Sequence, residues 1–342
     1  MTTPRRAAVL GGNRTPFARQ FGAYAEAANQ DMLTAAIEGL VARHGLAGER
    51  LGEVVAGAVI KHSRDFNLTR EAVLGSSLSP TTPAYDITQA CGTGLEAAIL
   101  VANKIALGQI ESGIAGGADS ASDAPVVVTG SLRRKLLRLN RAKTSADRVK
   151  AALAFRPTDV GVSVPANTEP RTGLSMGDHM ALTAAQWGVT REAQDELALA
   201  SHVNLAAAYE RGFFDDLLTP YLGLTVDQNL RPGSTLEKLG SLKPVFGKGE
   251  GATMTAGNST PLTDGASAVL LGSQEWADAH GLQPLAWFVD GETAAVDYVG
   301  GDEGLLMAPS YAVPRLLARQ GLRLQDFDFY EIHEAFASVV WA

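Results

Sequence analysis

Along the first 124 residues, short apolar runs alternate with longer stretches whose apolar residues recur at helical spacing. The short runs predict strands at Ala7–Leu10, Glu53–Ile60, Tyr85–Gln89 and Ser112–Ala115. The longer stretches predict helices at Gln30–His44, Leu68–Leu74 and Leu95–Leu107. This alternation is typical of an α/β protein with a mainly parallel sheet and helices on both faces, where ligands bind at the carboxyl ends of the strands.

The pattern changes between Ala124 and about Gly249, where strand alternation is not visible. A segment rich in Pro, Thr and Gly, Arg156–Gly177, is expected to be irregular. Helices are predicted at Asp178–Trp187 and Arg191–Arg211, the second with Thr190 as its N-cap. We interpret this middle region as an inserted lid or loop domain.

Strand-like runs resume near the end of the chain, with a helix between the last two. The strands are predicted at Ala266–Leu271, Leu285–Val289 and Phe327–Ile332, and the helix near Tyr311–Gln320. The final residue, Ala342, falls within the first turns of a further predicted helix. Because a domain boundary rarely falls inside a helix, we expect the chain to be shortened at this end.

Composition narrows the class of protein. With 342 residues, 46% of them hydrophobic, the chain can bury a large core. Its one cysteine excludes an intramolecular disulfide, a Cys-rich zinc site and a Cys-ligated iron–sulfur cluster, and we expect no metal site. The apolar run Ala7–Leu10 is too short for a signal peptide or a membrane span, so a soluble, cytoplasmic protein without a transmembrane segment is predicted.

The net charge of −8 argues against general nucleic-acid binding, but one segment departs from it. Between Arg133 and Lys150 the charge is +7, which leaves −15 on the remainder. The basic residues are Arg133, Arg134, Lys135, Arg138, Arg141, Lys143, Arg148 and Lys150. This segment could contact the phosphates of a ligand, a partner protein or an anionic membrane, or it could be a solvated helix face.

Cys91 lies between a predicted strand and a predicted helix, with Gly92 and Gly94 beside it. The glycines leave the backbone room to bend and a ligand room to approach. A thiol at a helix N-terminus faces unpaired N–H groups that favour the thiolate, which is a nucleophile for acyl transfer. The alternative is that Cys91 is a small buried hydrophobic residue.

Three motifs in order resemble those of the thiolase family: the Cys91 turn Asp86–Glu96, the loop Thr255–Gly265, and His333-Glu334-Ala335-Phe336. Arg14–Phe17 and Gly116–Ser120 add to the resemblance, although many members carry Glu at the position of Asp119. The family cleaves 3-oxoacyl-CoA by thiolysis or catalyses the reverse condensation. The His variant of the third motif resembles thiolases of fatty-acid β-oxidation complexes, which implies a possible hydratase/dehydrogenase partner subunit.

The resemblance also implies an architecture and an assembly. The expected fold is a layered αβαβα body of two similar halves with an inserted loop domain. Residues 1–124 plus 250–273 would form the N-terminal half, residues 125–249 the loop domain, and residues 274–342 an incomplete C-terminal half. Family members form homodimers or homotetramers.

Roles for individual residues follow from the same resemblance. Cys91 would be the nucleophile and His333 part of the oxyanion hole. Thr260 would contact the CoA pantetheine, Ala256 and Gly257 would offer backbone groups, and His179 would contact substrate. CoA and acyl-CoA would be substrates, and no cofactor would be bound permanently. The charge pattern suggests that Arg133 and Arg134 contact the CoA phosphates. The other histidines, His44, His62, His202 and His280, are interpreted as structural or surface residues.

Family members continue with a Gly-His-Pro segment, whose histidine activates the nucleophile, and a Cys-x-Gly segment, whose cysteine handles a proton. Neither segment occurs in this sequence. We therefore expect the chain alone to be a poor or inactive catalyst and prone to aggregation. Two alternatives stay open: a non-catalytic protein that binds acyl-CoA or lipid, and a structural subunit built on a thiolase body.

Overall fold

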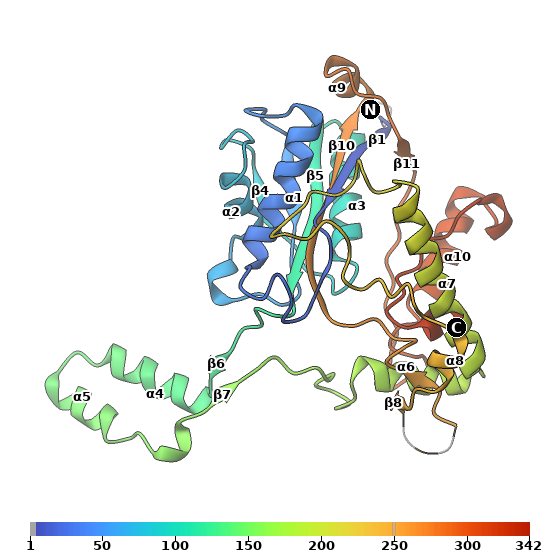
Figure 1. Cartoon of the computed structure of the whole chain (residues 1–342). Coiled ribbons are helices and arrows are strands. Elements are labelled where there is room, and N and C mark those ends of the chain that lie inside the picture. Colours follow the sequence, from blue (N-terminus) through green and yellow to red (C-terminus); the bar gives the residue numbers. More distant parts are fainter. Residues whose placement is uncertain (1–4, 248, 250) are drawn as a thin grey trace.

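Figure 1 shows the computed structural model, which describes residues 5–247, 249 and 251–342. Seven strands form the central sheet: β1 (Ala7–Arg14), β2 (Ala18–Arg19), β3 (Glu53–Ala56), β4 (Ala84–Asp86), β5 (Ser112–Ser120), β10 (Thr263–Ser273) and β11 (Ala286–Phe288). Their order is β11–β1–β10–β5–β3–β4, with β2 paired to β10. A strand from late in the chain thus lies between two early ones.

The sheet is mixed, so the expectation of a mainly parallel sheet is wrong. Only β3 pairs in parallel, with β4 and β5, whereas β10 runs antiparallel to both β1 and β5. The Gly116–Ser120 run, whose glycines suggest a turn after the strand predicted at Ser112–Ala115, instead continues β5. A Cβ atom at Gly116 would lie 2.4 Å from the Ser267 carbonyl oxygen, so the absence of a side chain lets β10 pair closely there.

Helices cover both faces of the sheet, as predicted. On one face pack α1 (Asn29–His44) and α2 (Leu68–Leu74), and on the other packs α3 (Thr93–Ala106). Neighbouring strand residues contribute to opposite faces: Val54 joins the core under α1, and Val55 joins the core under α3. This period of two explains why the buried strands read as continuous apolar runs.

The middle of the chain leaves the sheet and folds into two parts. The arm, residues 127–163, begins with β6 (Val127–Val128), continues through α4 (Gly130–Arg141) and α5 (Ser145–Ala152), and returns along β7 (Val162–Ser163). In Figure 1 it projects away from the sheet. The remaining elements are α6 (Met176–Gln186), α7 (Arg191–Glu210), α8 (Leu236–Gly240), β8 (Pro244–Phe246) and β9 (Met254–Thr255).

Two features of this middle region agree with the sequence. The Thr190 hydroxyl accepts a hydrogen bond of 3.2 Å from the backbone N–H of Ala193, which confirms the predicted N-cap of α7. A separate small core joins α6, β9 and the last motif, where the rings of Phe246 and Phe336 lie 5.6 Å apart, edge to face. The division of the chain into three domains stays a prediction.

The end of the chain differs most from the expected elements. Helices α9 (Gln274–Ala279), α10 (Pro309–Gln320) and α11 (Ala337–Trp341) form, and β11 pairs with β1 of the central sheet. Residues 327–332, all described, form no strand, so that prediction is wrong. No neighbouring strand supplies the backbone partners that a strand needs, and the Phe329 side chain is 88% exposed there. Short 3₁₀ turns occur at Ser63–Asp65, Pro157–Asp159 and Leu324–Asp326.

Candidate functional site

The turn that carries Cys91 is defined by bonds between residues close in sequence. The Thr93 hydroxyl accepts a hydrogen bond of 2.8 Å from the Gln89 N–H and donates one of 2.7 Å to the Ala90 carbonyl. These bonds hold Ala90 at a φ of 45°, in the left-handed region that non-glycine residues rarely adopt. The strained turn leaves Cys91 exposed just before α3.

The electrostatic surroundings of Cys91 differ from the expectation of a favoured thiolate. Desolvation by surrounding protein atoms raises the pKa of the Cys91 thiol, and the negative charge of Asp119 raises it further. A hydrogen bond from its own backbone N–H opposes this rise. The net effect favours the thiol, so the turn alone does not supply an activated nucleophile.

Asp119 lies at the end of β5 and is fixed by two backbone groups. Its carboxylate accepts hydrogen bonds from the N–H of Ile60 at 2.7 Å and from the N–H of Val59 at 3.0 Å. Burial raises the pKa of Asp119, while these bonds and the charge of Lys61 lower it in part. The carboxylate is therefore a fixed neighbour of the Cys91 turn.

The other two predicted motifs come together. The N–H of Thr260 donates to the Ala335 carbonyl at 3.1 Å, and the N–H of Ala337 donates to the Asn258 carbonyl at 3.0 Å. The loop and the last motif thus form one unit. His333 is exposed within it, and among the described residues its side chain has no hydrogen-bond partner. No contact between Cys91 and His333 is recorded in the described part of the chain.

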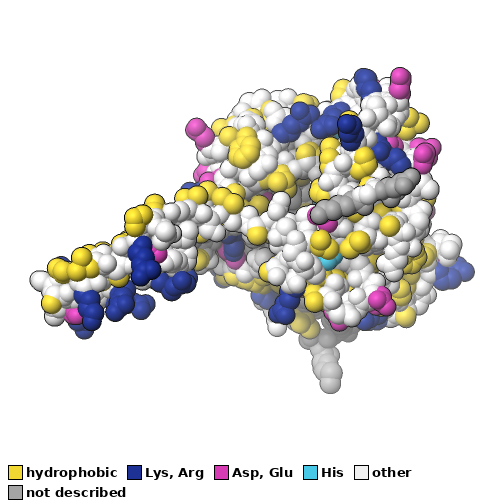
Figure 2. Space-filling model, turned by 90° about the horizontal axis from the view of Figure 1, so that it is seen from below, with side chains coloured by type: hydrophobic (Ala, Val, Ile, Leu, Met, Phe, Trp, Pro, Cys, Tyr) yellow, Lys and Arg dark blue, Asp and Glu magenta, His cyan; other side chains and the backbone are white. Residues whose placement is uncertain are grey.

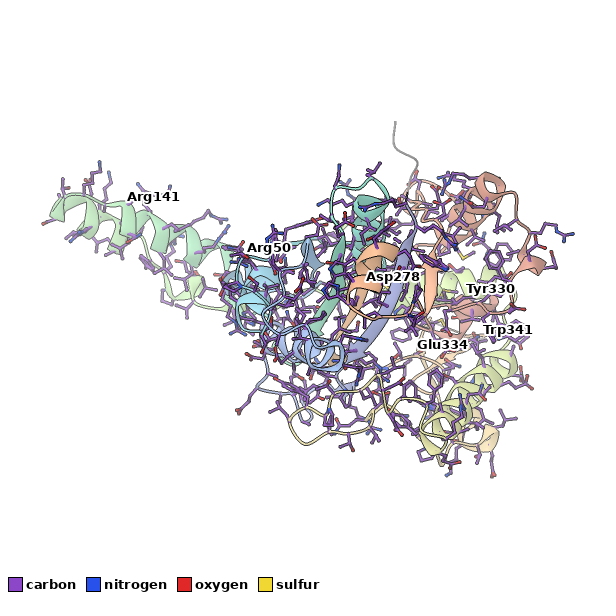
Figure 3. The ribbon with its side chains drawn as sticks, turned by 90° about the horizontal axis from the view of Figure 1, so that it is seen from above. Arg50, Arg141, Asp278, Tyr330, Glu334 and Trp341 are labelled. Carbon is purple, nitrogen blue, oxygen red and sulfur yellow. The ribbon has the colours of Figure 1, made fainter. Side chains whose placement is uncertain are left out.

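Beside this unit lies a pocket of about 150 Å³ between α7 and the loop. Its walls are Leu197, Ala198, Ser201, His202, Leu205, Asn229, Arg231, Ala256, Gly257, Asn258, Ser259, Thr260, Pro261, Glu334 and Ala337. Three predicted CoA-binding residues, Ala256, Gly257 and Thr260, are therefore brought together. Glu334 and Trp341, labelled in Figure 3, bind α7 at the Ser201 hydroxyl (2.7 Å) and the Ala193 carbonyl (3.0 Å).

Sequence reasoning missed the polar residues on the other walls of the pocket. Asn229 Oδ1 and Ser259 Oγ are buried atoms without a hydrogen-bond partner among the described residues. The exposed Arg231 guanidinium has no ion pair there either. A buried polar atom without a partner is costly, so these groups are available to water or to a polar ligand in the pocket. Ser259 adjoined a predicted contact, but nothing in the sequence pointed to Asn229.

His202 lines the same pocket, although the sequence suggested only a structural or surface role. Burial lowers the pKa of its imidazole, the charge of Arg231 lowers it further, and Glu334 opposes the change. The neutral ring can therefore donate or accept a hydrogen bond in the pocket at neutral pH. The histidine supplies polarity without adding a full charge.

His179 occupies a different place. It is buried on α6, with Nε2 2.8 Å from the Thr172 hydroxyl and its ring edge-on to Tyr298 at 5.5 Å. His179 is not among the residues that line the pocket. A structural role explains these contacts, and its predicted substrate contact stays a prediction.

Arg133 and Arg134 are exposed on α4, in the arm, and do not line the pocket. Figure 2 shows that basic side chains gather along one edge of the arm and hydrophobic ones along the other. Figure 3 shows Arg141, from the same basic segment, far out on the arm. The structure brings these residues together with one another rather than with the loop at residues 256–261.

Two other features are absent from the part of the chain that the structure describes. No group of three or more His, Cys, Asp or Glu side chains is arranged to hold a metal ion. None of the described helices has both the length and the apolar composition that a membrane crossing requires.

Family models match nearly the whole chain. The model described as "Thiolase, N-terminal domain" matches residues 7–275, and "Thiolase, C-terminal domain" matches residues 282–342. The 3-ketoacyl-CoA thiolase of Pectobacterium carotovorum subsp. carotovorum is 40% identical over 339 residues, and that of Yersinia enterocolitica is 39% identical. In both, the match takes in 97% of this chain and 77% of the relative. The chain thus spans about three quarters of the length of each of these relatives.

Solved structures agree in fold. Human mitochondrial 3-ketoacyl-CoA thiolase in complex with CoA is 27% identical with a TM-score of 0.83, covering 100% of this chain and 82% of that one. Bacillus anthracis acetyl-CoA acetyltransferase is 27% identical with a TM-score of 0.84, covering 100% of this chain and 83% of that one. These similarities confirm the predicted thiolase fold.

Proposed function

The chain belongs to the thiolase family of acyltransferases, and from this premise we propose that it cleaves 3-oxoacyl-CoA by thiolysis through an acyl-enzyme on Cys91. The reverse condensation would use the same site. The pocket beside α7 supports this proposal most directly, since it gathers the predicted CoA-binding loop, Arg231 and two buried polar atoms without partners. A nucleotide-bearing thioester offers the anionic and polar groups that such a pocket lacks.

The proposed reaction has two half-reactions. In the first, the Cys91 sulfur attacks the C3 carbonyl carbon, the C2–C3 bond breaks, and its electron pair leaves with C2, which takes up a proton to give acetyl-CoA. In the second, the sulfur of free CoA attacks the Cys91 thioester. The acyl group leaves as an acyl-CoA two carbons shorter, and the Cys91 sulfur is restored. The first half-reaction replaces a carbon–carbon bond by the Cys91 thioester, and the second exchanges this thioester for another of similar energy.

The surrounding residues have distinct proposed roles. His333 donates an N–H to the thioester oxygen on which negative charge develops. Thr260, Ala256 and Gly257 hold the pantetheine, and Arg231 binds a phosphate. Because the pKa of Cys91 is raised, most of the protein carries the thiol at neutral pH, and its proton must leave before or during attack.

The experiment that tests this function is intact-mass spectrometry of the chain after incubation with acetyl-CoA, with Cys91→Ser as control. We expect an added mass of one acetyl group on the unaltered chain and none on the variant. An adduct that persists in Cys91→Ser would place the chemistry elsewhere. Absence of an adduct in a folded protein would overturn the acyl-enzyme proposal.

A second candidate is a protein that binds acyl-CoA without reacting. It is favoured by the raised pKa of Cys91, which leaves the sulfur as a thiol in its exposed turn. Calorimetry with CoA separates the two candidates. Binding without an adduct supports the second, and binding with an adduct supports the first.

The proposed setting is a cytoplasmic homodimer or homotetramer, with a hydratase/dehydrogenase subunit as a possible partner. The edge strand β4, which is paired on one side only, is compatible with such assembly. Light scattering measures the assembly directly, and a monomer at all concentrations would contradict it.

A further inference from the structure

A buried carboxylate lies close to the pocket but does not line it. Asp195, on α7, is 4% exposed and pairs with Arg191 one turn earlier, with 2.7 Å between Arg191 Nε and Asp195 Oδ2. Arg191 in turn donates to the Leu239 carbonyl of α8 at 2.6 Å. Neither member of this pair lines the pocket.

The second carboxylate oxygen of Asp195 binds the loop. Asn258, 2% exposed, donates from Nδ2 to Asp195 Oδ1 at 2.9 Å and to the Thr253 carbonyl at 3.2 Å, and its Oδ1 accepts from the Thr255 N–H at 2.8 Å. With both ends of its amide engaged, the side chain has one orientation. Its backbone carbonyl accepts from the N–H of Ala337.

Asn258 is thus the point where three elements meet: α7 through Asp195, the loop through Thr255, and the last motif through Ala337. Ala256, Gly257 and Thr260 lie within two residues of it. A shift of the Asn258 side chain therefore moves all three groups assigned to CoA. Buried networks of this kind specify one arrangement when every member is satisfied and are costly when one is lost.

We propose that Asp195 is a positioning residue, which sets the geometry of the CoA-binding loop through Asn258 without touching the ligand. This inference rests on the proposed function, because it assumes that the loop binds CoA. Asp195 orients the Asn258 amide, the amide fixes the backbone at residues 255–258, and the backbone presents its groups to the pantetheine. Arg191 holds the carboxylate in place through its ion pair.

The test compares Asp195→Asn with Glu53→Gln in the full chain, with calorimetric titration by CoA as the main measurement. Glu53 is also buried and ion-paired, to Lys104, but it lies in β3 and borders no pocket residue. Both changes remove one buried charge at nearly constant shape. We expect the Kd for CoA to rise about tenfold in Asp195→Asn and to stay unchanged in Glu53→Gln.

A second readout separates positioning from stability. The rate of Cys91 acylation is measured against acetyl-CoA concentration. We expect the half-saturating concentration to rise in Asp195→Asn while the rate at saturation stays within about twofold. A merely structural role would reduce the folded fraction but leave the Kd of the folded protein unchanged, and that result would overturn the proposal.

Two further variants complete the experiment. The exchange Asp195→Asn with Asn258→Asp restores a carboxylate–amide pair, and we expect it to recover part of the lost affinity. If Asp195→Asn does not fold, Arg191→Lys, which keeps a positive charge beside Asp195, takes its place, with a smaller expected rise in Kd. If the unaltered chain does not bind CoA, the result contradicts the proposed function. If the unaltered chain binds CoA and the variants bind it equally well, the result contradicts only the positioning role of Asp195.

Discussion

The Cys91 turn and the pocket beside α7 are built in opposite ways. The bonds that shape the turn join Gln89, Ala90 and Thr93, all within five residues of one another. The pocket joins α7, residues 229–231, the loop at 256–261 and the last motif, and one of its bonds, Ser201 to Glu334, spans 133 positions. A local site is visible in sequence, whereas a site made of distant segments exists only when the fold is complete.

The largest effect is expected where the local turn depends on a distant neighbour. A Cβ atom at Gly57 would lie 1.9 Å from the Ile87 carbonyl oxygen, four residues before Cys91. Gly57→Ala must push this segment aside, so we expect the free energy of unfolding to fall by about 1–3 kcal/mol and Cys91 acylation to slow. Chemical denaturation and the mass assay measure the two effects.

Gly94→Ala is the matched control, because the nearest atom to its new Cβ would lie 4.0 Å away and the residue is helical. We expect its free energy of unfolding to stay unchanged or to rise by up to about 1 kcal/mol, because alanine favours a helix more than glycine does. If both variants lost the same free energy of unfolding, the clash at Gly57 would not be the cause, and the turn would be sensitive to any added side chain.

The next effect concerns the pocket. We expect Arg231→Ala to raise the Kd for CoA about tenfold, because it removes an unpaired cation from the pocket wall. Calorimetric titration measures the change. Arg211→Ala, at an exposed arginine outside the pocket, is the control. A similar rise in the Kd for CoA in both variants would indicate an effect of overall charge and not a specific contact with Arg231.

A smaller effect is predicted at the Cys91 turn itself. The negative charge of Asp119 raises the pKa of the Cys91 thiol, so removing that charge lowers this pKa and increases the thiolate fraction at a given pH. We expect Asp119→Asn to shift the pH midpoint of Cys91 alkylation by iodoacetamide downward and to raise the rate at pH 8 by about twofold to fivefold. The asparagine oxygen can still accept from Val59 and Ile60. An unchanged or higher midpoint would contradict the proposed electrostatic coupling.

The smallest effect is expected from the arm. Arg133→Glu with Arg134→Glu removes positive charge far from the pocket walls, so we expect the Kd for CoA to rise about twofold at low salt and not at 0.15 M salt. Titrations at two salt concentrations measure this. The control reverses the charge at Arg50 and Arg315, two exposed arginines elsewhere on the chain, by changing both to Glu. A large, salt-resistant effect limited to the arm would mean that these arginines contact CoA directly.

The comparison also explains which predictions succeeded. Helices α1, α2 and α7 were placed within one or two residues, because their apolar spacing, the Gly45 at the end of α1 and the Thr190 cap are local signals. The strand expected at 327–332 failed, because its alternating residues carry β-propensity but find no strand to pair with.

The direction of the sheet and the direction of the Cys91 pKa shift differ from the expectations for a related reason. Alternating strands and helices suggested parallel pairing, but β10 reaches the sheet after a long excursion and enters it antiparallel between β1 and β5. The helix N-terminus suggested a thiolate, yet burial and Asp119 raise the pKa of Cys91. Asp119 lies 28 positions further along the chain, and only the pairing of β5 within the sheet brings it near.

The sequence by itself determined the α/β class, the three ordered motifs, the Cys91 turn and the loop that contains Thr260, because each is encoded by residues that are neighbours along the chain. Tertiary structure alone decided that Asn229, Arg231 and His202 face this loop, and that Asp195 holds Asn258 from behind it. The physical reason is range: caps, turns and periodicity act over a few residues, whereas a pocket wall or a buried ion pair depends on how distant segments pack.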